Sequence, residues 1–329
     1  MIITLDANGL RNYIIKHSNN NLIFEYVQSI NDYTIASHQT FDDIPKDIQH
    51  LRFRKYNNEA VPSIDFSNYR FANLTAITVA EGSLNHIREL IIDGLERLES
   101  VKIGERCFSI DGEEECNDGV CRITNCPNLR QLEIGNESFR DFKSFELSNI
   151  NSLQSIKFGN WCFTRVCEFV IDGLPNLKNV NIGKYCFRIE NKECNDGLCR
   201  ITNCPNLRQL KIGNWSFTNY KSFKLFNVKS LHSINFGNEC FQKVCELVID
   251  GLENLKSLKI GRDCFRLDYY NRNEGVCRIT NCPNLRQLEI GNKSFRDFKS
   301  FELFNVNSIQ SIKFGQWCFY YADCSLKGE

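Results

Sequence analysis

Cysteine has the most obvious chemical potential in this chain of 329 residues, which contains 17 cysteines. The segment CRITNCPNLRQL occurs three times without change, beginning at Cys121, Cys199 and Cys277, and each copy holds two cysteines five positions apart. Thiolates bind zinc, paired cysteines form disulfides, and buried free cysteines pack as small apolar side chains. These alternatives predict a metal site, a crosslinked fold or a plain scaffold.

A zinc site would need ligands at a regular spacing. Cys116 and Cys194 extend two of the copies to C-x4-C-x4-C, but Arg272 stands at that place in the third copy. The spacing also differs from the paired C-x2–4-C motifs of zinc proteins. We therefore expect no metal, and a thiol- or metal-dependent enzyme centred on Cys116 and Cys194 is kept as an alternative from another functional class.

Other catalytic signals are missing from the sequence. It contains no P-loop, G-x-G-x-x-G, H-E-x-x-H or G-x-S-x-G motif. Its histidines are scattered, and no repeat places them beside a nucleophile. We expect no enzymatic activity and no cofactor. The histidines are His17, His38, His50, His86 and His232.

The chain is a repeat, which decides how its side chains are positioned. The identical segments start 78 residues apart, and a recurring phenylalanine divides each block into three units. The usual step between these phenylalanines is 24 residues, and every third step is 30 or 31; Leu84 extends the series to ten units. The recurring positions are Phe108, Phe139, Phe163, Phe187, Phe217, Phe241, Phe265, Phe295 and Phe319.

Each unit contains the pattern L-x-x-h-x-h, which begins ten residues before the recurring phenylalanine, as in LESVKI from Leu98. Its alternation is the period of a strand, and the first half of each unit, such as FELSNINS, predicts a second strand. Stacked coils would form a parallel ladder with strands about 4.8 Å apart. A glycine follows most of these strands, which suggests a turn with positive φ or a close approach of two backbones. Asn125, Asn149, Asn203, Asn227, Asn281 and Asn305 share a further column, alternating with Asp-Gly pairs at Asp93, Asp172 and Asp250, and suit turns.

These columns answer the question about the cysteines. The columns of Cys121 and Cys126 hold only apolar residues in the other units, such as Phe145 and Ile150. Leucine or phenylalanine cannot be a metal ligand, so these cysteines are predicted to be core thiols. The cysteines directly before the recurring phenylalanines alternate with Ser138, Ser216 and Ser294, which predicts a buried column of small side chains.

The segment LRQLEIGNESF resembles the leucine-rich repeat superfamily, with Phe139 in the last consensus place. The small-residue-plus-Phe endings WCF, WSF and KSF are most similar to the BspA-like branch of protists and bacteria. The resemblance implies a right-handed, mainly β solenoid of about ten 24-residue coils with little helix. It covers residues 61–324, leaving a divergent N-terminal cap at 1–60 and a tail at 325–329. It also implies a scaffold for binding, with the ladder face as the usual contact surface.

Composition restricts the partners. Lysine plus arginine and aspartate plus glutamate each total 40, so net charge gives no general attraction to nucleic acid or membrane. The N-terminus lacks the features of a secretory signal, and no stretch is apolar enough to span a bilayer. We therefore expect a cytoplasmic chain whose cysteines are thiols. An open C-terminal coil leaves room for end-to-end self-association.

Three surfaces are candidates for binding. Trp161, Tyr185 and Trp215 occupy a column that is charged in other units, which predicts either an exposed aromatic patch or a ladder of rings lying over neighbouring turns. The outward face of the strand ladder is mildly basic, and Lys157, Lys211 and Lys259 are its candidate contacts; a merely solvated sheet face is the alternative. The longer loops at 109–120, 188–198 and 266–276 are either binding loops or excursions without a partner.

We therefore expect a non-enzymatic repeat scaffold that binds another protein through the ladder face, the aromatic strip or both. The candidate residues are Trp161, Tyr185, Trp215, Lys157, Lys211 and Lys259. A surface adhesion or recognition protein is an alternative within the binding class. Nucleic acid is not the expected partner, because the basic face lacks interleaved aromatic side chains.

Overall fold

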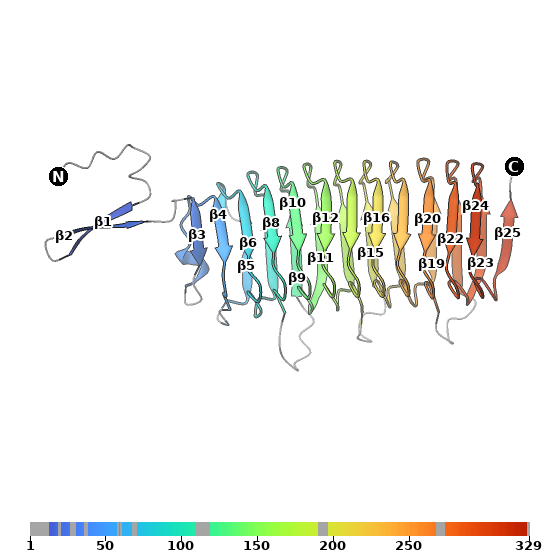
Figure 1. Cartoon of the computed structure of the whole chain (residues 1–329), viewed down its shortest axis with the longest axis horizontal. Helices are drawn as coiled ribbons and strands as arrows, with labels where there is room; N and C mark the ends of the chain where they lie inside the picture. The colour runs from blue at the N-terminus through green and yellow to red at the C-terminus, as the bar shows by residue number, and fades with distance from the viewer. Residues whose placement is uncertain are drawn as a thin grey trace.

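The computed structural model describes residues 13–18, 21–26, 31–35, 39–57, 59, 61–67, 71–109, 119–189, 197–267 and 274–327. Within these ranges it contains no α-helix, and a 3-10 turn, η2 (Phe41–Asp43), is described near the N-terminal end. Two parallel sheets, of 12 and 11 strands, run side by side along the molecule (Figure 1). The predicted β solenoid of stacked repeats is confirmed.

The 12-stranded sheet holds the strands formed by the last four residues of the L-x-x-h-x-h pattern, such as Ser100–Ile103 in LESVKI. Its strands pair in the order in which the coils follow one another in the chain. They are β3 (Asp32–Ile35), β4 (His50–Phe53), β6 (Ala76–Val79), β8 (Ser100–Ile103), β10 (Gln131–Ile134), β12 (Ser155–Phe158), β14 (Asn179–Ile182), β16 (Gln209–Ile212), β18 (Ser233–Phe236), β20 (Ser257–Ile260), β22 (Gln287–Ile290) and β24 (Ser311–Phe314).

The 11-stranded sheet holds the second strand of each coil, as the alternation in FELSNINS predicted. Its strands are β5 (Ser63–Asp65), β7 (Glu89–Asp93), β9 (Gly119–Thr124), β11 (Phe142–Ser148), β13 (Glu168–Asp172), β15 (Leu198–Thr202), β17 (Ser222–Phe226), β19 (Glu246–Asp250), β21 (Gly275–Thr280), β23 (Phe298–Phe304) and β25 (Asp323–Lys327). A separate antiparallel hairpin pairs β1 (Tyr13–Ser18) with β2 (Asn21–Tyr26).

The solenoid extends past the repeat boundaries at both ends. Strand β3 pairs with β4, and β4 pairs with β6, so the 12-stranded sheet begins at Asp32 although the repeat pattern begins near residue 61. At the other end, β25 adds a strand to the second sheet that runs from Asp323 into the segment 325–329 expected to be a tail.

The core lies between the two sheets. In the four-residue strands from β4 to β22 the second and fourth side chains are buried and the first and third point outward, as in β8 with Val101 and Ile103 inside. The two end strands of this sheet, β3 and β24, depart from that pattern. The recurring phenylalanines form a continuous buried stack; the rings of Phe139 and Phe163 are 4.8 Å apart and nearly parallel. Because each coil covers the apolar face of the one before it, the core is continuous along the axis.

The glycine that follows most of these strands is required because the backbones of neighbouring coils approach each other closely there. A Cβ on Gly183 would lie 2.2 Å from the carbonyl oxygen of Gly159, and a Cβ on the other glycines of this column would lie within 3.0 Å of backbone atoms of the preceding coil. None of the glycines in this column has positive φ, so close approach of backbones is the correct one of the two sequence-based explanations. A methyl group here would push two neighbouring coils apart.

Left-handed backbone is used at three other places in the coil. The asparagine column has φ between 51° and 57°, and Gly94, Gly173 and Gly251 fill the same place with φ of 66° to 69°. The predicted turn role of these residues is confirmed. The recurring phenylalanines also have positive φ, and so do the residues two positions before them, including Trp161 and Tyr185. A bulky residue rarely adopts this conformation, which costs about 1–3 kcal/mol and must be held by surrounding contacts.

Candidate functional site

The predicted core thiols are confirmed for the cysteines of the identical segments. Cys121, Cys126, Cys199, Cys204, Cys277 and Cys282 are all buried and unbonded to other sulfur atoms. Among the residues that the structure describes, no three histidine, cysteine, aspartate or glutamate side chains are grouped to hold a metal ion. Cys116 and Cys194, the basis of the alternative metal or thiol site, lie outside the described residues.

The small column before the recurring phenylalanines has a further requirement. Ser138 and Cys162 each direct their side-chain donor at the carbonyl oxygen of a glycine in the preceding coil, at 2.9 Å and 3.0 Å. The same bond recurs in the other coils, for example from Ser216 to Gly183 at 3.0 Å. The column therefore selects a small donor, which explains why cysteine alternates with serine. Because Ser138 and Ser216 are fully buried, they belong to this packing.

Cys167 departs from the expectation that the cysteines are thiols, because it is joined in a disulfide. It lies just before β13, is half-buried, and stands outside the columns that face the core. The contrast has a physical reason: the core columns hold each thiol among apolar side chains, whereas the position of Cys167 is open to solvent on one side.

Burial of the core thiols predicts loss of stability at alkaline pH. Desolvation raises the pKa of Cys126 and Cys282 from 9.0 to about 11, and that of Cys204 to about 12. Between pH 9 and the native pKa, a thiol of the unfolded chain has lost the proton that the same thiol of the folded chain keeps. The contribution of each buried thiol to the free energy of unfolding is therefore fully present below pH 9 and decreases as pH rises. Each thiol contributes up to about 1.4 kcal/mol per pH unit.

Urea unfolding at about pH 8 and about pH 10.5 checks this linkage. Substituting Cys126, Cys204 and Cys282 with alanine together should leave a smaller difference between the two pH values than in the unmodified chain. An equal difference in both proteins would show that the thiols are not responsible.

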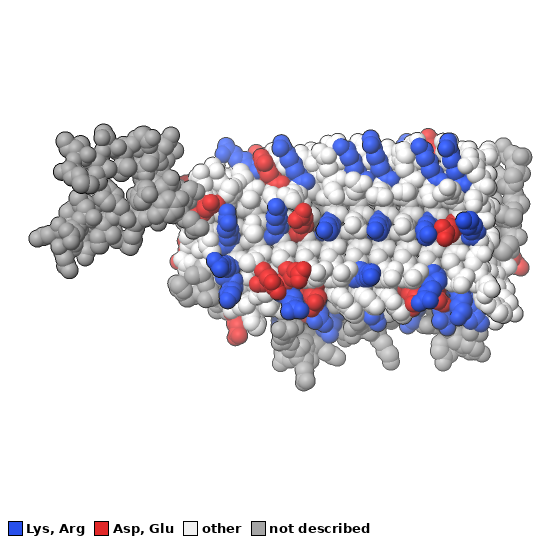
Figure 2. All heavy atoms as spheres, viewed as in Figure 1, with Lys and Arg blue, Asp and Glu red and all other residues white. Residues whose placement is uncertain are grey.

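A central basic strip crosses the solvent face of the 12-stranded sheet. Strands β12, β14, β16, β18 and β20 contain no aspartate or glutamate. Their outward residues are serine, asparagine, glutamine and lysine, and a second row of basic residues lies one position before the strands. Figure 2 shows both rows of lysine and arginine running along this face. The strip consists of Lys157, Lys211 and Lys259 in the mid-strand row and Lys178, Arg208 and Lys256 in the second row.

Most of these cations are open to solvent. Lys157, Lys211 and Lys259 are exposed, and register pairing places Asn181 and Asn235 between them on the intervening strands. Lys259 reaches Glu289 of β22 at 3.2 Å, at the border of the strip. Lys157 and Lys211 form no ion pair with any side chain in the described ranges. The central part of the face therefore carries uncompensated positive charge.

The aromatic strip of Trp161, Tyr185 and Trp215 is a ring ladder. The rings of Trp161 and Tyr185 are 4.1 Å apart and 6° from parallel, and those of Tyr185 and Trp215 are 6.1 Å apart and 7° from parallel. Trp161 is 41% exposed, whereas the other two are half-buried. Each ring thus turns its faces toward its neighbours and its edge toward solvent, which matches the ladder alternative rather than a patch of free ring faces.

The structure brings the two predicted surfaces together. Lys157 and Trp161 belong to one coil, four residues apart, and Lys211 and Trp215 have the same relation two coils later. The basic strip and the aromatic strip therefore run beside each other over the coils of β12, β14 and β16. Lys259 lies beyond the aromatic strip, where Glu239 and Asp263 occupy the aromatic column. The predicted loops at 109–120, 188–198 and 266–276 lie largely outside the described residues.

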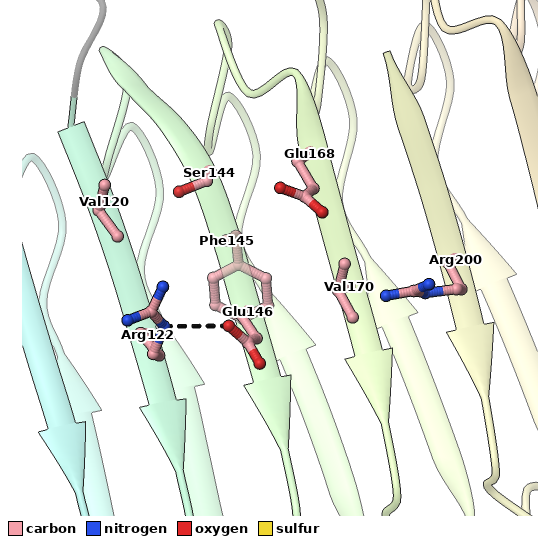
Figure 3. Close-up of a pocket in the computed structure, with 8 residues that line it drawn as sticks. All are labelled: Val120, Arg122, Ser144, Phe145, Glu146, Glu168, Val170 and Arg200. Atoms are coloured by element: carbon pink, nitrogen blue, oxygen red, sulfur yellow. Dashed lines mark hydrogen bonds and ion pairs between the residues drawn. The ribbon is translucent and has the colours of Figure 1, made fainter. Parts of the chain in front are cut away.

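The 11-stranded sheet presents a different surface, with mixed charge. A shallow hollow of about 140 Å³ lies over β9, β11, β13 and β15 (Figure 3). Arg122 donates to Glu146 across it at 3.0 Å, and Arg278 pairs with Glu302 in the corresponding place of the last block. The middle block differs, because Arg200 of β15 lies opposite Lys224 of β17 in the register. Glu168 of β13 and Glu246 of β19 lie on the flanking strands, so this face carries both signs of charge, unlike the central basic strip.

Sequence reasoning missed an opening in the 11-stranded sheet. Pairing between β17 and β19 stops at Lys224 and Val248, whereas every later or earlier pair from β7 onward continues two residues further. Asn227 is the one residue of its column between Gly94 and Asn281 that makes no backbone bond to the next coil. A groove of about 720 Å³ results, and Phe226 beside it is 69% exposed. The sequence did contain a signal for this opening: Phe226 stands in a column that holds Asp, Thr or Ser in most other coils.

The last coil exposes side chains that are core in earlier coils. Ile312 and Phe314 of β24 occupy inward columns yet are 40% and 46% exposed, and Trp317, Tyr320 and Tyr321 beside them are also exposed. End-to-end self-association remains a prediction.

Comparisons with known proteins are without result: no family model, no curated protein and no solved structure matches the chain. Within the described residues, no helix has the length and apolar character needed to cross a membrane.

Proposed function

We propose that the chain is a non-enzymatic repeat scaffold of the leucine-rich repeat type, and that it binds a protein partner through the 12-stranded sheet. The observation that supports this most is the central basic strip. Five successive strands carry exposed cations and carboxamides without a single acidic residue. A face with no binding role would be kept soluble equally well by mixed charges, as on the opposite sheet.

The aromatic strip belongs to the same contact surface. Tryptophan and tyrosine are enriched at binding hot spots because they bury large rigid areas at low entropic cost. Trp161 and Trp215 border the basic strip from the coils that carry Lys157 and Lys211. Their exposed edges would form a rigid apolar margin, and the lysines would supply attraction and orientation.

Affinity capture from an extract of the source cell tests the proposal. The unmodified chain is compared with K157E/K211E, which reverses the charge in the middle of the strip, and with K102E/K313E as a control. Lys102 and Lys313 occupy the same mid-strand column outside the strip, so both variants change net charge equally. The unmodified chain and the control should retain a common protein partner. K157E/K211E should bind that partner with at least about tenfold lower affinity, which corresponds to roughly 1.4 kcal/mol.

A double variant of the aromatic strip, W161A/W215A, separates the two contributions in the same experiment. It should weaken capture without removing the dependence on charge, provided that circular dichroism shows the native fold. If all four chains captured the partner equally, its binding site would lie outside the basic strip and the aromatic strip. If the unmodified chain captured no protein, the proposed scaffold function would lose its support.

A further inference from the structure

The mid-strand lysines of the central basic strip have a regular spacing. Lys157, Lys211 and Lys259 lie on β12, β16 and β20, which are alternate strands of the parallel sheet. Adjacent strands are about 4.8 Å apart, so successive lysines of this row stand roughly 9.6 Å apart along the solenoid axis. The row is straight, because the coils stack without change of register from β12 to β20 (Figure 1).

Carboxamides fill the places between these lysines. Asn181 pairs with Lys157 and Lys211 in the register, and Asn235 with Lys211 and Lys259. Both asparagines are exposed, and neither bonds to another side chain of the described residues. A carboxamide offers two donors and an acceptor, which suits backbone N–H and C=O groups that are themselves unpaired.

One polymer matches both the charge spacing and the carboxamides. A polyproline II segment has no internal hydrogen bonds, rises about 3.1 Å per residue and repeats every three residues. Every third side chain therefore points to the same side at intervals of roughly 9.3 Å, close to the spacing of the lysines. Acidic residues at every third position would meet the lysine row while the backbone passes over the asparagines.

We infer that the partner segment bound by this face is an extended acidic peptide in polyproline II conformation, lying along the solenoid axis across β12 to β20. This inference rests on the proposed scaffold function and specifies the chemistry of its partner. Charge complementarity selects the peptide: Lys157 and Lys211 of the strip form no ion pair with any described residue, and the second basic row runs parallel to them.

A single-stranded nucleic acid fits the same face less well. Sequence-tolerant binding of single strands combines cations with aromatic faces on which bases stack. Here the rings of Trp161, Tyr185 and Trp215 are stacked on one another, so only the outer faces at the ends of the ladder are open. Phosphate attraction would remain, but stacking would contribute little.

Fluorescence anisotropy with synthetic probes tests the inference on the full chain. One labelled peptide repeats the triplet Glu-Pro-Pro, and a second has the same composition with its glutamates contiguous. The triplet peptide should bind about tenfold more tightly than the contiguous one, and K157E/K211E should abolish the difference, whereas K102E/K313E should preserve it. Binding should weaken as salt is raised.

Several results would overturn the inference. Equal affinity for the two peptides would remove the spacing argument, and equal losses in K157E/K211E and K102E/K313E would reduce binding to general electrostatics. An oligouridine probe that binds as tightly as the triplet peptide at physiological salt would favour nucleic acid. If the triplet peptide fails while a cellular partner is still captured and lost in K157E/K211E, the scaffold function stands and this inference alone falls.

Discussion

Replacing Phe187 with alanine is expected to lower the free energy of unfolding by about 4 kcal/mol. Its ring is fully buried and lies in the phenylalanine stack, 5.2 Å from Phe163 and 4.9 Å from Phe217. It also contacts Phe169 at 4.4 Å from the second sheet. Alanine would leave a cavity at the centre of the solenoid, and the neighbouring coils cannot close it because their backbones are fixed by the ladder.

Urea unfolding followed by circular dichroism measures this loss, with Lys293→Ala as the control. Lys293 has the same left-handed backbone, φ 61°, but its side chain is exposed. The control should change stability by less than about 0.5 kcal/mol. A loss below about 1 kcal/mol in Phe187→Ala would mean that the stack does not hold neighbouring coils together.

Replacing Gly183 with alanine is expected to cost about 3 kcal/mol, the upper end of the range for overpacking. The added methyl carbon would stand 2.2 Å from the carbonyl oxygen and 2.5 Å from the carbonyl carbon of Gly159. Both are backbone atoms, so no side chain can rotate away. The two coils must separate locally, which also strains the bond from Ser216 to the Gly183 carbonyl.

Gly251→Asn is the matched control for this glycine. Gly251 has φ 66° and open space where a Cβ would be, and asparagine occupies the same column with φ near 55° in other coils. We expect a change within about 0.5 kcal/mol in the same unfolding measurement. If both variants cost the same, backbone approach is not what restricts the glycine column.

Much of the architecture was predictable because the repeat makes each coil a test of the others. The residues Cys121, Phe145 and Phe169 occupy one column and therefore share one environment. The property that cysteine and phenylalanine have in common is their apolar character, which predicts that the column is buried. The same comparison predicted strands from alternation and turns from the asparagine column. The candidate lysines were placed correctly on the outward face for the same reason: Lys157 alternates with Ile156 and Phe158, which are buried.

Other features depended on how neighbouring coils meet in space. The left-handed backbone of the recurring phenylalanines could not be expected, since local preference disfavours it for a bulky residue. The choice between free aromatic faces and a ring ladder required the tilt of Trp161 relative to Tyr185, which no column reveals. The opening beside Phe226 arises from a mismatch between two coils, and the disulfide of Cys167 lies outside the buried columns.

Carbodiimide crosslinking of the captured partner, followed by mass spectrometry, tests the central claim most directly. The reagent joins a carboxylate to a lysine that it contacts, so it reports the binding face itself. The account predicts crosslinks at Lys157 and Lys211, and their loss from K157E/K211E with no gain elsewhere. Crosslinks confined to Lys102 and Lys313, or to Lys224 on the opposite sheet, would contradict it.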